Sequence, residues 1–207
     1  TPKPSSAASD VYKRQISNAS LLDEGTAAAE AMNMFFRKSK NGSIFLVDSE
    51  CHPQTIEIIK TRAEALSIKI NVEHYSKFKF NNEVFGAIIQ YPNSSGEIIN
   101  YSDFINEAHK NNSFVCVASD LMALTLIKPP GEFNADVVIG NSQRFGVPLG
   151  YGGPHAAFFS TSNEFKRLIP GRIIGITKDK DGNNAFRMAL QTREQHIRSC
   201  LLYTSDA

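Results

Sequence analysis

The chain has 207 residues, 42% of them hydrophobic, and its 22 basic and 21 acidic side chains leave a net charge of +1. This length suits a domain of ordinary size with a substantial core. The balanced charge offers no basic surface of the kind that dominates nucleic-acid binding, and no apolar run approaches the ~20 residues that span a bilayer. We therefore expect neither a nucleic-acid partner nor a membrane partner.

The cysteines give no sign of a disulfide framework or a metal site. Cys51, Cys116 and Cys200 lack the CxxC spacing that is typical of zinc ligands or redox pairs. No signal peptide is visible, so we expect a reducing compartment, either the bacterial cytoplasm or a mitochondrial matrix.

The two ends of the chain differ from its middle. Residues 1–15 are rich in Pro, Ser and Ala and show neither helical nor strand periodicity, and residues 199–207 break off after a polar run. SAASDVYKRQ and CLLYTSDA, in these two segments, resemble adapter-derived sequence at the edges of translated environmental reads. We expect a non-native leader over 1–15, a non-native tail over 199–207 and a chain that is a fragment; frayed natural termini are the alternative.

The segment between these ends alternates helical and strand patterns. Apolar residues recur at helical spacing in segments that we expect to form helices, namely residues 25–40, 53–66 and 102–112. Short apolar runs lie between and after them, and we expect strands over residues 43–48, 68–72, 84–92, 113–120, 135–140 and 155–161. Continuous apolar strands separated by helices predict an α/β fold, with a largely parallel sheet flanked by helices.

Ligands usually bind such a sheet at the carboxyl ends of its strands. This rule draws attention to residues 48–52, to Tyr91 and Pro92, to Asp120 and to the segment 140–155, GNSQRFGVPLGYGGPH. Five glycines and two prolines make that segment able to approach another surface closely, although a plain connection between two strands has the same composition. It lacks both the Walker pattern and GxGxxG.

Three other motifs have a plain structural explanation. Asp23 and Glu24 precede a strong helical pattern, where acidic residues cap the positive end of the helix dipole. Cys51 and His52 could form a nucleophilic pair, but neighbours in sequence rarely face each other and no third orienting group is identifiable. His196, in the polar run TREQHIR, is more typical of a surface residue than of a metal ligand.

Together, long segments of the chain closely resemble the glycine decarboxylase family. The most specific are SQRFGVPLGYGGPHAAFF (142–159) and RMALQTREQHIR (187–198), and the resemblance runs from Ile16 to Arg198. The family is the pyridoxal-phosphate-dependent P-protein of the glycine cleavage system, an aminomethyl-transferring glycine dehydrogenase. The chain resembles its N-terminal half, or the first subunit where the enzyme is split in two. The resemblance implies, over residues 16–198, the large domain of the aspartate-aminotransferase class, fold-type I.

A pyridoxal-phosphate enzyme needs a lysine that forms a Schiff base with the cofactor. In this family that lysine belongs to the C-terminal half, and laying its segment on this one sets Gln143 at the lysine position. Lys128 precedes two prolines and Lys178 lies in a polar turn, so neither is expected to replace it. The resemblance therefore implies that this chain binds no cofactor covalently, although the complete enzyme uses pyridoxal phosphate.

The same comparison suggests a degenerate cofactor site, or a loop facing the active site of the other half. Asp23 and Glu24 would oppose a phosphate at the following helix N-terminus, where this fold class holds it. Asp120 stands roughly where the class places the carboxylate that pairs with the pyridine nitrogen, or is a simple strand-end aspartate. We expect no catalytic residue and no metal ligand in this chain. The predicted site residues are Gln143, Gly150, Tyr151, Gly152, Gly153, Pro154, His155, Asp120, Glu24, Gly25, Thr26 and His52.

The complete enzyme, as the resemblance implies, decarboxylates glycine and passes the aminomethyl group to the lipoyl arm of the H-protein. The implied partners are the C-terminal half or second subunit, the lipoyl H-protein and glycine, and this half is expected to be inactive alone. A stand-alone, non-catalytic binding protein derived from such an enzyme is the alternative. An independently active enzyme is disfavoured by the missing lysine.

Overall fold

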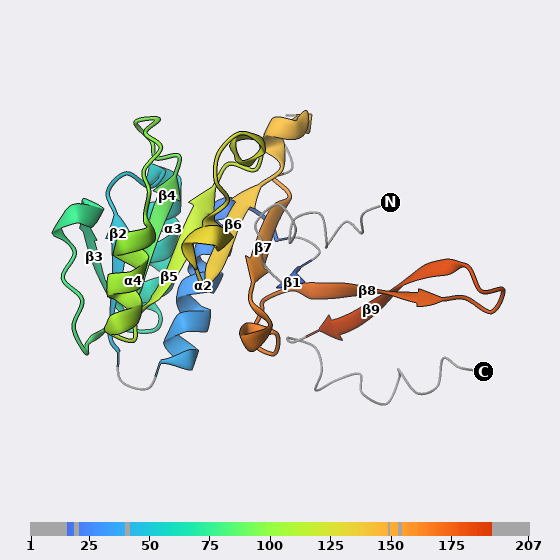
Figure 1. Cartoon of the computed structure of the whole chain (residues 1–207), viewed down its shortest axis with the longest axis horizontal. Helices are drawn as coiled ribbons and strands as arrows, with labels where there is room; N and C mark the ends of the chain where they lie inside the picture. Colours follow the sequence, from blue (N-terminus) through green and yellow to red (C-terminus); the bar gives the residue numbers. More distant parts are fainter. Residues whose placement is uncertain (1–15, 19–20, 40–41, 149, 153–154, 192–207) are drawn as a thin grey trace.

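The structure is a computed structural model that describes residues 16–18, 21–39, 42–148, 150–152 and 155–191 (Figure 1). Its α-helices are α2 (Glu24–Lys38), α3 (Pro53–Glu64) and α4 (Ser102–Lys110). Its strands are β1 (Ile16–Ser17), β2 (Ile44–Asp48), β3 (Lys69–Glu73), β4 (Val84–Tyr91), β5 (Phe114–Ser119), β6 (Val137–Asn141), β7 (Ala157–Thr161), β8 (Arg172–Lys178) and β9 (Asn184–Gln191). Short 3₁₀ helices are η1 (Tyr75–Lys77), η2 (Ala123–Thr125), η3 (Pro130–Phe133), η4 (Gln143–Phe145) and η5 (Asn163–Phe165).

The strands from β1 to β7 form one mixed sheet in the order β1-β7-β6-β5-β4-β2-β3. Neighbours from β3 to β6 pair in parallel, whereas β7 is antiparallel to both β6 and β1. The predicted α/β fold with a largely parallel sheet is confirmed, and every helix and strand predicted between residues 25 and 161 is present. The predicted leader and tail, and His196, lie outside the described residues.

The helix α2 follows directly from its sequence. Its first half is rich in alanine, the strongest helix former, and its last turn carries Arg37 and Lys38, whose charges suit the negative end of the helix dipole. The helix ends at Ser39, whose backbone is extended. In α3, Pro53 stands in the first turn, where its missing N–H costs no hydrogen bond.

Helices cover both faces of the sheet. Alternate residues of a strand point to opposite faces, so each central strand packs against helices on both sides. Cys116 and Ala118 of β5 belong to the buried cluster that includes α2 and α3, whereas Val115 and Val117 belong to the cluster that includes α4. Figure 1 shows α4 on one face, with α2 and α3 on the other. Both clusters are almost free of solvent contact, which accounts for the continuous apolar character of the central strands.

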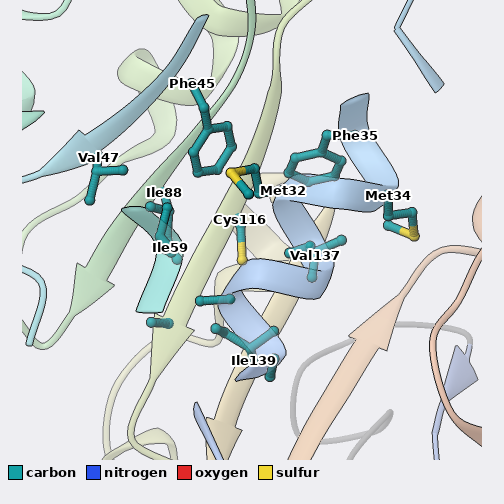
Figure 2. Close-up of a cluster of buried hydrophobic side chains, with 14 of the residues drawn as sticks. Met32, Met34, Phe35, Phe45, Val47, Ile59, Ile88, Cys116, Val137 and Ile139 are labelled. Atoms are coloured by element: carbon teal, nitrogen blue, oxygen red, sulfur yellow. The ribbon is translucent and has the colours of Figure 1, made fainter. Parts of the chain in front are cut away.

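The α2 face forms the larger cluster. Figure 2 shows Met32 and Phe35 of α2 lying among Phe45, Cys116 and Val137 of the strands, and all five side chains are fully buried. This packing fixes α2 across the central strands. Its first turn is therefore held at the edge of the sheet where the parallel strands end.

Two features differ from the simple series of alternating elements. The direction of β7 is opposite to that of its neighbour β6, and β8 and β9 form a separate two-stranded antiparallel sheet with Gly182 at its turn. In Figure 1 this hairpin extends away from the seven-stranded sheet. No helix in the described part of the chain has the length and apolar character that a membrane crossing requires.

Candidate functional site at the carboxyl edge of the sheet

The carboxyl ends of β5 and β6 and the first turn of α2 meet at one edge of the sheet. Asn141, the last residue of β6, contacts Glu24 at the start of α2, and Asp120 after β5 contacts Arg144 in η4. The first contact joins residues 117 positions apart in sequence, and the second joins residues 24 positions apart. The structure therefore places Glu24, Asp120 and Gln143, three of the predicted site residues, at this edge.

Asp23 caps α2. Its backbone is extended, and its carboxylate oxygen Oδ1 accepts a hydrogen bond from the backbone N–H of Thr26 at 2.6 Å. This is the usual way in which an aspartate satisfies an otherwise free helix N–H. The capping interpretation of the sequence is correct for Asp23, and the amide of Thr26 is committed to it.

Glu24 has a different environment from its neighbour. Its side chain is turned inward, and the amide Nδ2 of Asn141 donates a hydrogen bond to its oxygen Oε2 at 3.3 Å. Burial raises the pKa of the Glu24 carboxyl from 4.5 to about 7, although the bond from Asn141 works against the rise. The negative charges of Asp120 and Asp23 act in the same direction as burial. Glu24 is therefore poised to bind a proton near neutral pH.

Asn141 is a site residue that sequence reasoning missed. Its Nδ2 donates to Glu24, and its oxygen Oδ1 accepts a hydrogen bond from the backbone N–H of Gln143 at 3.0 Å. Gln143 is the first residue of η4. The available signal was its position as the polar last residue of a buried strand. The amide atoms Nε2 and Oε1 of Gln143 are themselves buried, with no hydrogen-bond partner among the described residues.

The Asp120 side chain has two partners, one in η4 and one directly after β5. It forms an ion pair with Arg144, and its Oδ1 accepts a hydrogen bond from the backbone N–H of Met122 at 3.0 Å. The second contact is an Asx turn that shapes the chain directly after β5. The strand-end interpretation accounts for this second contact.

The glycine-rich segment continues from η4 towards β7. Gly146, Gly150 and Gly152 have φ values of 89, 50 and 119 degrees, which other residues adopt only with strain. Tyr151 is fully exposed between the last two, and His155 is exposed before β7. Gly153 and Pro154 lie outside the described residues. The segment therefore presents an aromatic ring to solvent.

Cys51 and His52, which follow the end of β2, have different environments. Cys51 is buried, with its thiol 3.9 Å from the carbonyl oxygen of Ile88, and burial raises its pKa well above the usual value. His52 is exposed, and its Nδ1 lies 3.3 Å from the hydroxyl of Ser94. The two side chains therefore do not form a nucleophilic pair.

Two glycines permit the close packing behind this edge. A Cβ on Gly25 would lie 2.4 Å from Cδ1 of Ile58 in α3. A Cβ on Gly140 would lie 2.2 Å from the carbonyl oxygen of Ser119 and 2.6 Å from the ring of Phe158. Gly25 is thus a packing residue between α2 and α3, and Gly140 allows β6 to lie close to its neighbours.

The residues present do not fit pyridoxal phosphate as a covalently held cofactor. Gln143 carries an amide, which cannot form the required imine. The ammonium group of Lys128 lies 4.9 Å from the ring centre of Phe133. At the start of α2, Asp23 accepts from Thr26 and the Glu24 carboxyl is buried nearby, so the helix end that would receive a phosphate already faces two carboxyl groups.

Comparisons with known proteins agree on one family. A family model described as "Glycine cleavage system P-protein" matches residues 8–200. The mitochondrial glycine dehydrogenase (decarboxylating) of Dictyostelium discoideum is 62% identical over 88% of this chain, and that of Nostoc punctiforme is 54% identical over 91%. In both cases the chain spans only 19% of the length of the relative.

Solved structures give the same result for the fold. An inhibitor-bound glycine decarboxylase (P-protein) of the glycine cleavage system matches with a TM-score of 0.84 and 30% identity, over 94% of this chain and 46% of that chain. Cystathionine γ-lyase of Lactobacillus plantarum matches with a TM-score of 0.61 at 9% identity, over 77% of this chain and 42% of that one, which shows a shared fold. A putative O-acetylhomoserine (thiol)-lyase of Campylobacter jejuni, whose structure contains a pyridoxyl-lysine, has a TM-score of 0.61 at 12% identity, over 79% and 40%. With the family match extending over nearly its whole length, the chain belongs to the glycine cleavage system P-protein family.

Proposed function

We propose that this chain is part of the N-terminal, non-catalytic half of a glycine decarboxylase. The complete enzyme decarboxylates glycine with pyridoxal phosphate and passes the aminomethyl group to the lipoyl H-protein. The observation that carries the proposal lies just after β6 and at the start of α2. Gln143, which the resemblance sets at the position of the cofactor lysine, carries an amide, and the start of α2 carries the carboxyl groups of Asp23 and Glu24. The cofactor is then held by the C-terminal half or second subunit.

The carboxyl edge is the surface that we assign to contact with that second half. Large apolar side chains are exposed on the segments that border it. We call them the apolar rim: Leu22, Leu126, Phe145 and Tyr151. An exposed set of this kind beside a site is typical of a surface that is covered in an assembly. The chain spans under a fifth of its curated relatives, so most of the complete protein is available to cover it.

The compartment follows the relatives in this proposal. Their names include a mitochondrial and a bacterial glycine dehydrogenase, so we propose the bacterial cytoplasm, or the mitochondrial matrix for a eukaryotic source. The described cysteines Cys51 and Cys116 are free and buried, which suits a reducing environment.

A segment exchange tests the proposal. Residues 21–191 of this chain replace the matching segment of the Dictyostelium enzyme, and glycine decarboxylation with lipoyl H-protein is measured. We expect the chimera to retain at least about a tenth of the parental kcat/KM, because a non-catalytic half must supply only packing and shape. A chimera that folds, binds pyridoxal phosphate and lacks all activity would contradict the proposal and favour a stand-alone binding protein.

A second chimera tests whether activity depends on the structure of the exchanged segment. Gly140→Val places a side chain against the Ser119 carbonyl and the Phe158 ring, so it damages the packing of β6 without removing a polar group. We expect this second chimera to lose activity. If it were as active as the first, the exchanged segment would have no part in the function.

A further inference from the structure

The hairpin of β8 and β9 stands apart from the seven-stranded sheet. Its strands pair with each other from Arg172 and Gln191 to Lys178 and Asn184, and in the described part of the chain they pair with no strand of the larger sheet. In Figure 1 the hairpin extends away on the side of β1 and β7. Two antiparallel strands are at best marginally stable in water without a third strand or a packing surface. The hairpin therefore needs support from another part of the protein.

The root of the hairpin is anchored and its far end is well formed. Ile173, at the start of β8, packs against the buried cluster on the α2 face. At the turn, Oδ1 of Asp179 accepts hydrogen bonds from the backbone N–H groups of Asp181 and Asn183 at 2.9 and 2.8 Å. These bonds lie within the turn and attach it to nothing else. The hairpin is thus an arm with a fixed base and a defined tip.

The two faces of this arm differ in composition. The register places Ile174 opposite Met188 and Ile176 opposite Phe186. Residues directly opposite each other, and residues two apart on a strand, belong to the same face. We call these four positions the apolar arm face. The positions of the other face are small or polar: Gly175 opposite Arg187, and Thr177 opposite Ala185.

The apolar arm face is open where its exposure is described. Phe186 is 68% exposed, although an aromatic ring stabilises a protein most when it is buried. A hairpin that needs packing and presents an aromatic ring to solvent is typical of a surface that is covered in an assembly. The arm also carries more basic than acidic side chains, namely Arg172, Lys178, Lys180 and Arg187 against Asp179 and Asp181.

Most of the complete protein lies outside this chain and can provide the cover. The chain spans 19% of the two curated relatives and 46% of the solved P-protein chain. That solved chain matches over 94% of this one with a TM-score of 0.84, so a protein with much more chain shares the architecture. An arm that projects from its own core is placed to meet a neighbouring unit. In the proposed function, the largest such unit is the second half.

We propose that the β8–β9 hairpin is a docking arm, whose apolar face lies in an apolar groove of the second half, with acidic side chains of that half at the border of the groove. The inference rests on the proposed function and deepens it, because it adds a contact separate from the carboxyl edge. It assigns a role to a hairpin that would otherwise be a poorly supported element of this chain.

Photochemical crosslinking identifies the unit that covers the arm. In the chimeric enzyme, Phe186→p-benzoylphenylalanine is irradiated and the linked peptides are mapped by mass spectrometry. We expect crosslinks to peptides of the second half. Crosslinks only to the first half, crosslinks to a second copy of the enzyme, or no crosslink at all would overturn the proposal.

Thiol labelling measures the cover itself. Phe186→Cys is alkylated in the isolated 207-residue chain and in the chimera, with Thr177→Cys, an exposed position on the opposite face, as the matched control. We expect the cysteine at 186 to react at least about tenfold more slowly in the chimera, and the cysteine at 177 to react at similar rates in both. Equal rates for the cysteine at 186 would overturn the proposal.

Neither readout requires turnover, so the two proposals can fail separately. An active chimera whose cysteine at 186 stays reactive would remove the docking arm and leave the proposed function intact. An inactive chimera whose residue 186 crosslinks to the second half would support the docking arm and contradict the proposed function.

Discussion

Asn141 and Glu24, which are 117 positions apart in the chain, are joined by a hydrogen bond of 3.3 Å at the carboxyl edge of the sheet. The bond forms because α2 packs against β4, β5, β6 and β7, and its first turn lies beside the end of β6. It brings a carboxyl group to the start of α2, where the proposed function places the lost phosphate site. The same relationship underlies the proposed loss of the cofactor site.

Gly140 provides the most stringent test of the packing beneath this edge. We expect Gly140→Ala to lower the free energy of unfolding by about 3 kcal/mol or more, because its Cβ meets backbone and ring atoms that cannot move independently. Gly146→Ala has open space around it and a φ of 89 degrees, so it should cost only about 1 kcal/mol of backbone strain. Urea denaturation of both variants measures the difference. Equal losses would show that close approach does not decide the residue at position 140.

The buried thiols should be chemically silent in the folded chain. Cys51 and Cys116 are fully buried, and burial raises the pKa of each well above its usual value, so little reactive thiolate forms. In a Cys200→Ser variant we expect negligible reaction with an aromatic disulfide reagent at neutral pH, and stoichiometric reaction of both thiols in denaturant. Rapid reaction of either thiol under native conditions would mean that the α2 face opens readily.

Much of this architecture could be predicted from residue patterns alone. The alternation of helical periodicity with apolar runs located α2, α3, α4 and the strands from β2 to β7, because burial on both faces leaves a strong compositional signal. The direction of β7 could not be predicted, since HAAFFST packs equally well in either orientation. The hairpin of β8 and β9 was missed, although the Asp-Gly pair at 181–182 is a turn signal between two β-rich segments.

The site was predictable in position and less so in detail. The rule of strand carboxyl ends directed attention to Asp120 and to the segment that follows β6, and the structure places both at the carboxyl edge of the sheet. It could not reveal that Asp23 and Glu24, adjacent in sequence, have different contacts, one with the Thr26 N–H as a helix cap and the other with the side chain of Asn141. That distinction depends on which way each side chain turns at the first turn of α2, a tertiary property with no local signal.

The apolar rim should matter for assembly and not for folding. Leu126 is 91% exposed and Tyr151 is fully exposed, so replacing both by serine removes no core contact. In the isolated chain, we expect Leu126→Ser with Tyr151→Ser to leave the urea midpoint unchanged. In the chimeric enzyme, we expect the same double variant to reduce glycine decarboxylation by roughly tenfold or more. The exposed Ile98, on the loop after β4, gives the control Ile98→Ser. Full activity of the double variant would remove the rim from the proposed contact surface.

Restoring a lysine should not restore the cofactor site. Gln143→Lys supplies an amine, but tight binding also needs the phosphate to be held by free N–H groups at the start of α2. The Thr26 N–H already donates a hydrogen bond to Asp23, and Glu24 adds a second carboxyl group at this helix end. We therefore expect no imine absorbance at micromolar pyridoxal phosphate. Adding Asp23→Ser and Glu24→Gly should tighten phosphate binding, with Ser retaining most of the helix cap. Micromolar binding by the single variant would mean that these acids do not oppose the phosphate.

Reductive trapping tests the central claim most directly. The purified chain is incubated with pyridoxal phosphate and reduced with borohydride, and its peptides are mapped by mass spectrometry, with the complete Dictyostelium enzyme as the positive control. A chain with Gln143 at the end of β6 is predicted to yield only scattered, substoichiometric labelling of surface lysines, while the control yields one stoichiometric pyridoxyl-lysine. A stoichiometric pyridoxyl-lysine at any single position between residues 16 and 198 of this chain would contradict the claim that this half does not hold the cofactor.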